Sequence, residues 1–209
     1  LIGSLGTLAV LTEVTFKVFP IPPASATLLF GFSDLPKALR AAQRIVHSQF
    51  TPQALDLLDA AAGRLLQEPA LTEFPFALVV GTAGPEAVVE RIGRELPSLL
   101  VLESPTEIAR LSGDAESKLW EKIRELTPTF LRTQPEGVAI KASVLLTRME
   151  DAIAAASRVA SESGLASATL ARAGTGVVYC YLWASNQSRD PKRHIDGVSG
   201  AGKGEHLVR

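Results

Sequence analysis

The chain opens with a stretch in which apolar and polar side chains alternate. Its apolar residues lie at even positions, namely Leu8, Val10, Val14, Phe16 and Val18. The odd positions between them carry Glu13, Thr15 and Lys17. A period of two is typical of a strand with one buried face, and Pro20 and the pair Pro22-Pro23 end it. The sequence therefore predicts a strand from Leu8 onward. It is entered through the loop Gly3-Ser4-Leu5-Gly6, whose glycines let the backbone approach a ligand closely.

Strands and helices are predicted to alternate after this proline-rich linker. Ala26–Phe32 is a short apolar run typical of a buried strand, and Ser33 or Asp34 can cap a helix entered through Pro36. Further along, the patterns predict a helix over Gln53–Gln67, a strand over Phe76–Gly81, a helix over Pro85–Leu96 and a short strand over Leu99–Leu102.

The second half of the chain repeats this order. Ser104-Pro105-Thr106-Glu107 has the pattern of a capping box, and the helix it predicts breaks near Gly113 and resumes until Pro128. The remaining elements are a strand over Val138–Leu145, a second capping box at Thr147–Glu150 with an alanine-rich helix closed by Gly164, and the strands Ala166–Arg172 and Val177–Trp183 joined at Gly174-Thr175-Gly176. Residues Ser185–Gly204 are polar and glycine-rich, which predicts a loop or disorder.

This order of elements, with at least one hairpin, indicates an antiparallel sheet covered by helices on one face. We interpret it as an α+β fold of the ferredoxin-like type.

Composition limits the classes of function. The chain has 209 residues, 46% of them hydrophobic, which is enough for a sizeable core, and its formal net charge of -1 gives no electrostatic case for nucleic acid. The single cysteine, Cys180, excludes an intrachain disulfide and fits a reducing compartment. No apolar run reaches the roughly 18 residues of a membrane-spanning helix.

The opening stretch Gly3–Pro20 resembles the end of the flavin domain in FAD-linked oxidases of the vanillyl-alcohol oxidase type, with Leu5 in place of an acidic residue and Ala9 in place of a glycine. The resemblance implies FAD as cofactor and flavin contacts from five positions, namely Gly3, Ser4, Gly6, Thr7 and Val10. It also implies a remnant of an FAD-binding domain over residues 1–22 and a cap or substrate domain over residues 23–209, so that the chain would be a fragment unable to hold FAD unaided. The alternative is a plain glycine turn before an amphipathic strand.

Two further segments resemble the same family and suggest contacts with substrate. Trp120–Arg124 is similar to a segment of 2-hydroxy acid dehydrogenases in which an arginine grips the substrate carboxylate, a task that suits the planar guanidinium. The strand containing Lys141 resembles one whose lysine also faces substrate, although Ser143 replaces an aspartate and Thr147 a proline. The alternatives are an exposed helical arginine beside a core tryptophan and a solvated lysine.

One motif departs from the catalytic pattern. Catalytic members carry H-x-G-D-G-N-x-H where this chain has Arg172 and Tyr179 in place of the histidines and Thr175 in place of the aspartate. Arginine stays protonated and has no acceptor atom, so this argues against a metal-assisted site built by this chain alone. His47 and His194 are interpreted as structural or surface residues. The segment Gly204-Glu205-His206 is interpreted as the approach to a strand over Glu205–Val208.

The resemblance is to an FAD-dependent oxidoreductase that oxidises a 2-hydroxy acid to a 2-oxo acid, as a glycolate oxidase subunit does. It implies a small 2-hydroxy acid substrate, flavoprotein and iron-sulfur partner subunits, and a cytoplasmic location or peripheral attachment to the inner membrane through those partners. One alternative is a non-catalytic flavin-domain subunit that scaffolds such a complex. Another is a ferredoxin-like domain with an unrelated regulatory ligand.

Overall fold

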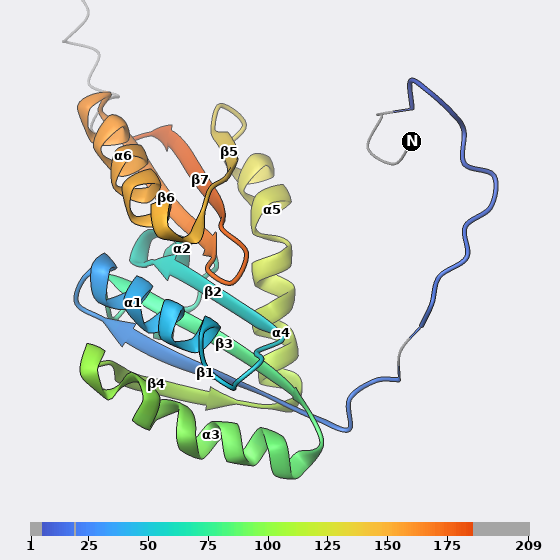
Figure 1. The fold of residues 1–209 in the computed structure, drawn as a ribbon. Helices are drawn as coiled ribbons and strands as arrows, with labels where there is room; N and C mark the ends of the chain where they lie inside the picture. The colour runs from blue at the N-terminus through green and yellow to red at the C-terminus, as the bar shows by residue number, and fades with distance from the viewer. Residues whose placement is uncertain (1–5, 19, 186–209) are drawn as a thin grey trace, which may run out of the picture.

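A computed structural model of the chain describes residues 6–18 and 20–185. Its centre is a seven-stranded sheet in the order β4-β1-β3-β2-β6-β7-β5, and every pair of neighbouring strands is antiparallel (Figure 1). The strands are β1 (Ala24–Phe32), β2 (Ala54–Asp59), β3 (Phe76–Gly84), β4 (Thr106–Leu111), β5 (Val138–Ser143), β6 (Leu165–Arg172) and β7 (Val177–Ala184). The α-helices are α1 (Leu35–Val46), α2 (Ala60–Leu65), α3 (Glu86–Leu100), α4 (Gly113–Arg124), α5 (Leu126–Thr133) and α6 (Met149–Glu162).

The first half of the sheet confirms the ferredoxin-like prediction. The units β1-α1-β2 and β3-α3-β4 give the spatial order β4-β1-β3-β2, in which the two central strands are the first and third of that half. The unit β5-α6-β6 and the returning strand β7 then extend the sheet beyond β2, with β6 pairing β2 at Asp56–Leu58. The hairpin between β6 and β7, predicted at Gly174–Gly176, is present.

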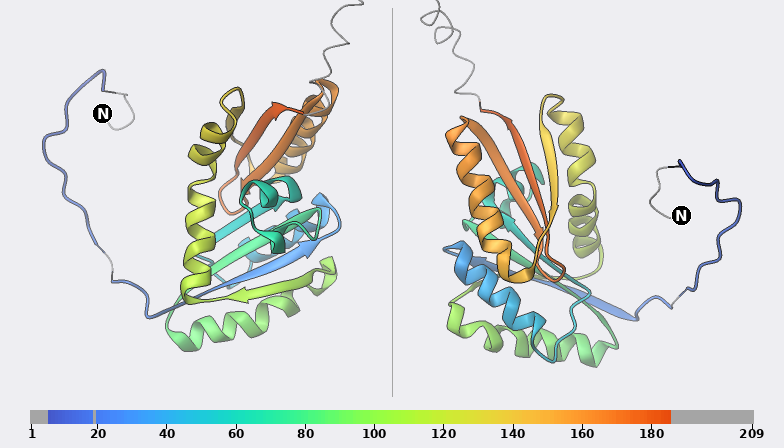
Figure 2. Two further views of the ribbon diagram at one scale, coloured as in Figure 1. Left: turned by 180° about the vertical axis from the view of Figure 1, so that it is seen from behind. Right: turned by 45° about the horizontal axis from the view of Figure 1, so that its top comes forward.

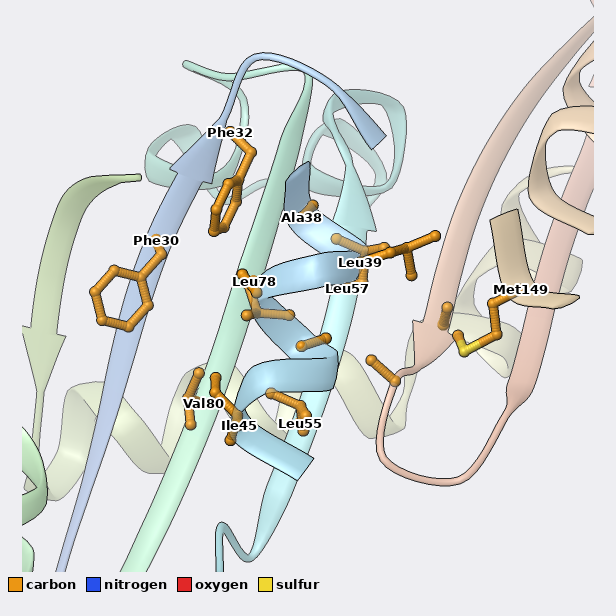
Figure 3. Close-up of a cluster of buried hydrophobic side chains, with 14 of the residues drawn as sticks. Phe30, Phe32, Ala38, Leu39, Ile45, Leu55, Leu57, Leu78, Val80 and Met149 are labelled. Carbon is orange, nitrogen blue, oxygen red and sulfur yellow. The ribbon is translucent and has the colours of Figure 1, made fainter. Parts of the chain in front are cut away.

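Helices cover both faces of the sheet, so the prediction of a single covered face was wrong (Figure 2). One core lies beneath α1, α3 and α6, and Figure 3 shows Ile45 of α1 and Met149 of α6 with Leu57 and Leu78 of the strands. The second core, on the opposite face, packs α2, α4 and α5 against the same strands. Central strands are therefore buried on both sides, which gives continuous apolar runs in the sequence and obscures the face on which each helix lies.

The start of α1 follows the sequence signals closely. Asp34 is the N-cap and its carboxylate accepts a hydrogen bond of 2.9 Å from the backbone N–H of Lys37, while Pro36 lies in the first turn. Ala38, Leu39, Ala42 and Ile45 are buried, so the helix places one apolar stripe on the sheet.

The helix predicted over Gln53–Gln67 is a strand followed by a short helix. Leu55 and Leu57 of β2 face the α1 side while Asp56 and Leu58 face the other side, and all four are buried. Such a two-sided burial pattern resembles a helical one over so few residues. The carboxylate of Asp59 then caps α2 by accepting from the backbone N–H of Ala62 at 2.7 Å.

Three predictions between Leu99 and Pro128 were also wrong. Leu99–Leu102 belongs to the end of α3 and the 3-10 turn Val101–Glu103, and Thr106–Leu111 is the edge strand β4 rather than a helix. Ser104 adopts a left-handed backbone with φ 48°, which ends the preceding turn instead of capping a helix. The next helix begins at Gly113, and Pro128 lies in the first turn of α5, where a proline costs no hydrogen bond.

The helix predicted after Thr147 is confirmed as α6, but no side-chain hydrogen bond caps it, so the second capping box was wrong. Its first turn is instead preceded by the 3-10 turn Leu146–Arg148. The strand predicted over Val138–Leu145 is confirmed as β5, ending at Ser143.

Residues 8–18 form no strand. They extend away from the sheet in Figure 1, and Val10, Phe16 and Val18 are 86%, 79% and 84% exposed. Strand geometry requires hydrogen bonds to a neighbouring strand, and the sheet described above offers none at this position. Gly3, Ser4, His194 and the predicted strand over 205–208 lie outside the described residues, and the boundary between residues 22 and 23 remains a prediction.

Candidate functional site

A cleft of about 390 Å³ lies where α4 crosses the ends of β1, β3 and β2. Nine residues line it: Ser25, Gln53, Ala54, Gly81, Glu116, Ser117, Trp120, Arg124 and Arg172. They come from five segments far apart in the sequence, so only the folded sheet brings them together.

The indole of Trp120 is placed by a glycine on the strand below it. A Cβ on Gly81 would lie 2.8 Å from Trp120 Cζ2, so only glycine leaves room for the ring at this position of β3. Thr27 lies directly opposite Gly81 in the register, and Trp120 Nε1 donates to Thr27 Oγ1 at 2.8 Å. The tryptophan is therefore fixed by both shape and hydrogen bonding.

Glu116 completes this network from the first half of α4. Its two carboxylate oxygens accept from Thr27 Oγ1 at 2.8 Å and from Ser25 Oγ at 2.7 Å, and the residue is only 6% exposed. Because both oxygens are occupied by hydroxyl donors, the carboxylate serves to hold α4 on β1.

Arg172 is held by a carboxylate on the neighbouring strand. Asp56 lies directly opposite Arg172 in the β2–β6 register, and Arg172 Nη1 donates to Asp56 Oδ2. Asp56 is 1% exposed, and this burial raises its pKa to about 6, opposed by the nearby charge of Arg172. The carboxylate is therefore ionised at neutral pH and fixes the guanidinium at the edge of the cleft.

Arg124 lies at the other side of the same cleft. It is the last residue of α4, it is exposed, and it takes part in none of the ion pairs found among the described residues. Two guanidinium groups thus line one cleft: that of Arg172 is paired with a buried carboxylate, and that of Arg124 has no ion-pair partner in the described part of the chain. Such a pair can bind a carboxylate through several charge-assisted hydrogen bonds.

Lys141 lies on the same face of the sheet but does not line this cleft. It is exposed on β5, opposite Tyr179 in the register, and its Nζ is 5.8 Å from the centroid of the Tyr179 ring. Tyr179 lies two positions along β7 from Val177, the partner of Arg172. The structure therefore brings Arg124 and Arg172 together and leaves Lys141 two strands away.

The hairpin that carries Arg172 and Tyr179 depends on its second glycine. Gly176 has φ +76°, and a Cβ there would lie 2.1 Å from the carbonyl oxygen of Val144. The backbone N–H of Val144 donates to the Gly176 carbonyl at 2.8 Å, so the turn is joined to the end of β5.

The residues predicted to contact flavin do not belong to this cleft. Gly6, Thr7 and Val10 lie in the exposed N-terminal segment, and a Cβ on Gly6, at φ +76°, would have nothing within 4 Å. This open backbone fits one wall of a cofactor site, but the described residues do not enclose a flavin.

No group of three or more His, Cys, Asp or Glu side chains suited to a metal ion occurs among residues 6–18 and 20–185. No helix in the same ranges is long and apolar enough to cross a membrane.

Sequence reasoning missed the role of Arg172 and its partner Asp56. The arginine was interpreted only as a lost histidine, and the aspartate was assigned to a helix. One signal was present, because a charged residue inside the apolar run Leu55–Leu58 indicates a buried charge that requires a partner.

The described residues thus form a ferredoxin-like sheet with a cleft lined by two arginines. A model of the family described as FAD linked oxidases, C-terminal domain, matches residues 21–199. The chain therefore belongs to this family, whose cofactor is FAD.

Two curated relatives are similar to the chain at low identity. The chain is 21% identical over 200 residues to "Glycolate oxidase subunit GlcD" of Bacillus subtilis (strain 168), covering 93% of this chain and 43% of the relative. It is 24% identical over 179 residues to the protein of the same name from Escherichia coli (strain K12), covering 83% and 36%. The chain thus spans about two fifths of the length of these relatives.

Two solved structures share the fold. An alkyldihydroxyacetonephosphate synthase has a TM-score of 0.63 at 15% identity, covering 82% of this chain and 38% of that one. The 4-ethylphenol oxidase from Gulosibacter chungangensis has a TM-score of 0.55 at 10% identity, covering 78% and 40%.

Proposed function

We propose that the chain forms the substrate-binding domain of an FAD-dependent oxidoreductase that oxidises a 2-hydroxy acid to a 2-oxo acid. The observation that carries this proposal is the convergence of Arg124 and Arg172 on one cleft in a member of an FAD-linked oxidase family. The name of the curated relatives, glycolate oxidase subunit, supports the same substrate class.

The two arginines suit the carboxylate that every 2-hydroxy acid carries. A guanidinium offers five N–H donors, and Asp56 engages the Nη1 group of Arg172, which leaves other donors of that side chain for a ligand. Arg124 adds a positive charge with no ion-pair partner among the described residues. Binding the carboxylate at two points would fix the direction in which the neighbouring C–OH group faces.

FAD, when bound, supplies the two-electron acceptor for the C–H and O–H hydrogens that the substrate loses. In this proposal Gly3, Ser4, Gly6, Thr7 and Val10 form one wall of the flavin site, and the described ones among them, Gly6, Thr7 and Val10, are exposed. Lys141 would add positive charge at the margin of the same face, where its ammonium lies over Tyr179.

A second candidate function is a non-catalytic flavin-domain subunit that scaffolds a complex with a catalytic flavoprotein and an iron-sulfur subunit. The replacement of two histidines by Arg172 and Tyr179 favours it, because neither replacement is a neutral-pH base. In that case the arginine cleft would bind a carboxylate without oxidation.

The oxidase and the scaffolding subunit can be distinguished by visible spectroscopy. An anaerobic spectrum of the full-length flavoprotein is taken before and after addition of glycolate or D-lactate. Bleaching of the flavin bands that is lost in Arg124→Ala and retained in Arg132→Ala supports oxidation by this chain, since Arg132 is an exposed arginine of the neighbouring helix α5. Bound flavin that neither acid bleaches would contradict the oxidase proposal and favour the scaffolding subunit.

A further inference from the structure

A second cleft of about 470 Å³ adjoins the arginine cleft. Eleven residues line it: Val46, Phe50, Thr51, Pro52, Gln53, Ala54, Leu55, Asp56, Arg172, Gly174 and Thr175. Gln53, Ala54 and Arg172 line both clefts. The two clefts therefore share part of their lining, and Arg172 contributes to both.

The second cleft differs from the first in its chemistry. Its exposed wall is mostly carbon, supplied by Val46, Phe50, Pro52 and Leu55. The one carboxylate in the wall, that of Asp56, is turned to Arg172 and buried. Among the described residues, therefore, no unpaired charge lines the apolar part of this cleft.

The backbone explains why the space exists. Strands β2 and β6 pair only over Asp56–Leu58, so residues 51–55 and the hairpin after Arg172 separate on either side of an opening. A hydrogen bond of 2.8 Å from the backbone N–H of Ala173 to the carbonyl of Leu55 closes the inner end. The opening of the cleft is bordered by Phe50–Ala54 on one side and by Gly174 and Thr175 on the other.

We infer that this second cleft holds the side chain of the substrate, and that the preferred substrates are 2-hydroxy acids with an extended apolar chain rather than glycolate. This inference rests on the proposed function and makes it more specific. The carboxylate lies between Arg124 and Arg172, and the hydrocarbon chain passes Arg172 onto Phe50, Pro52 and Leu55. Apolar walls with a few charged groups at one end are the usual form of a site for an amphiphilic small molecule.

The size of the effect follows from the burial of methylene groups. Each CH₂ removed from water should strengthen binding by about fourfold until the cleft is filled. A 2-hydroxy acid with six further carbons should therefore exceed glycolate in kcat/KM by on the order of a hundredfold or more, allowing for incomplete burial.

Gly174 offers a substitution that fills the cleft without disturbing the backbone. It is exposed, it does not have a left-handed φ, and a Cβ there would meet only Leu55 Cβ at 3.8 Å, an ordinary contact. Gly174→Phe should occupy the apolar wall. Ser98→Phe, at an exposed position of α3 that lines neither cleft, is the matched control.

The test compares glycolate with 2-hydroxyoctanoate as substrates of the full-length flavoprotein, and acetate with octanoate as unreactive ligands by calorimetry. We expect the eight-carbon compounds to be preferred in both assays. Gly174→Phe should lower this preference by about tenfold or more, and Ser98→Phe should leave it unchanged.

The inference would be overturned if kcat/KM and affinity were equal for short and long acids, or if Gly174→Phe lowered them equally for both. Either result would leave the proposal of 2-hydroxy acid oxidation intact. Tighter binding of octanoate that Gly174→Phe abolishes, combined with a flavin that no 2-hydroxy acid bleaches, would support the apolar subsite and overturn the proposed oxidase function.

Discussion

Asp56 and Arg172 face each other across β2 and β6, and the buried carboxylate of one holds the guanidinium of the other, which contributes to the lining of two clefts. These strands come from the two halves of the chain, and their pairing is short. The ion pair therefore joins the ferredoxin-like half to the β5–β7 half at the position where we propose that substrate binds.

Replacing Asp56 with Asn should weaken substrate binding through Arg172. The amide keeps the size of the carboxylate but removes its charge, so the guanidinium loses the partner that orients it. We expect KM for a 2-hydroxy acid to rise by about tenfold with a smaller change in kcat. Steady-state kinetics of the flavoprotein measure this. Asp151→Asn, which removes only an exposed ion pair with Arg148, is the control and should leave KM unchanged. An unchanged KM in Asp56→Asn would show that the ion pair does not position Arg172.

Ionisation of the Asp59 carboxyl should lower the free energy of unfolding of the domain as pH rises from about 4 to about 6.5. Burial raises the pKa of Asp59 from 3.8 to about 6, opposed by hydrogen bonds from the backbone of Ala62 and from Thr169. The folded state therefore binds the proton more tightly than the unfolded state, so its contribution to stability is complete below pH 3.8 and is lost as pH passes about 6. Denaturant unfolding across this range should show a loss of about 2 kcal/mol from this group.

Asp59→Asn tests the assignment of this pH dependence. Asparagine is an equally good N-cap, so the hydrogen bond to Ala62 N–H can be kept while the titrating group is removed. The unfolding free energy of the variant should fall less steeply with pH. If the variant and the original protein show the same slope, the dependence arises elsewhere.

The alternation of elements, the hairpin at Gly174–Gly176 and the capping of α1 by Asp34 could be predicted from the sequence, because each depends on local backbone preferences. The strand β2 could not, because Leu55–Leu58 is buried on both faces and a two-sided pattern has no clear period. Family resemblance suggested Arg124 as a substrate contact, and that role stays a prediction. The pairing of Asp56 with Arg172 spans 116 positions and depends on the β2–β6 register, which no local pattern specifies.

Gly81→Ala should destabilise the wall of the arginine cleft. The added Cβ would lie 2.8 Å from Trp120 Cζ2, and the indole is held in place by its bond to Thr27, so α4 must shift to relieve the contact. A loss of about 1–3 kcal/mol in unfolding free energy is expected. The control is Gly93→Ala within α3, where the added Cβ meets only the mobile end of Arg110 and alanine favours the helix. Equal stability of the two variants would contradict the close packing of Trp120 on β3.

Alanine should destabilise the β6–β7 hairpin at one of its two glycines and be tolerated at the other. Gly176→Ala combines a left-handed backbone at φ +76° with a Cβ only 2.1 Å from the Val144 carbonyl oxygen, so the turn must rearrange and its link to β5 is lost. We expect a loss of about 2–4 kcal/mol. Gly174→Ala should be neutral within about 0.5 kcal/mol, because its Cβ meets only Leu55 at an ordinary distance. Thermal unfolding of both variants, followed by circular dichroism, measures the difference. Because Arg172 and Tyr179 flank the turn, Gly176→Ala should also weaken carboxylate binding, and retention of both stability and binding would show that the turn conformation described here is not required.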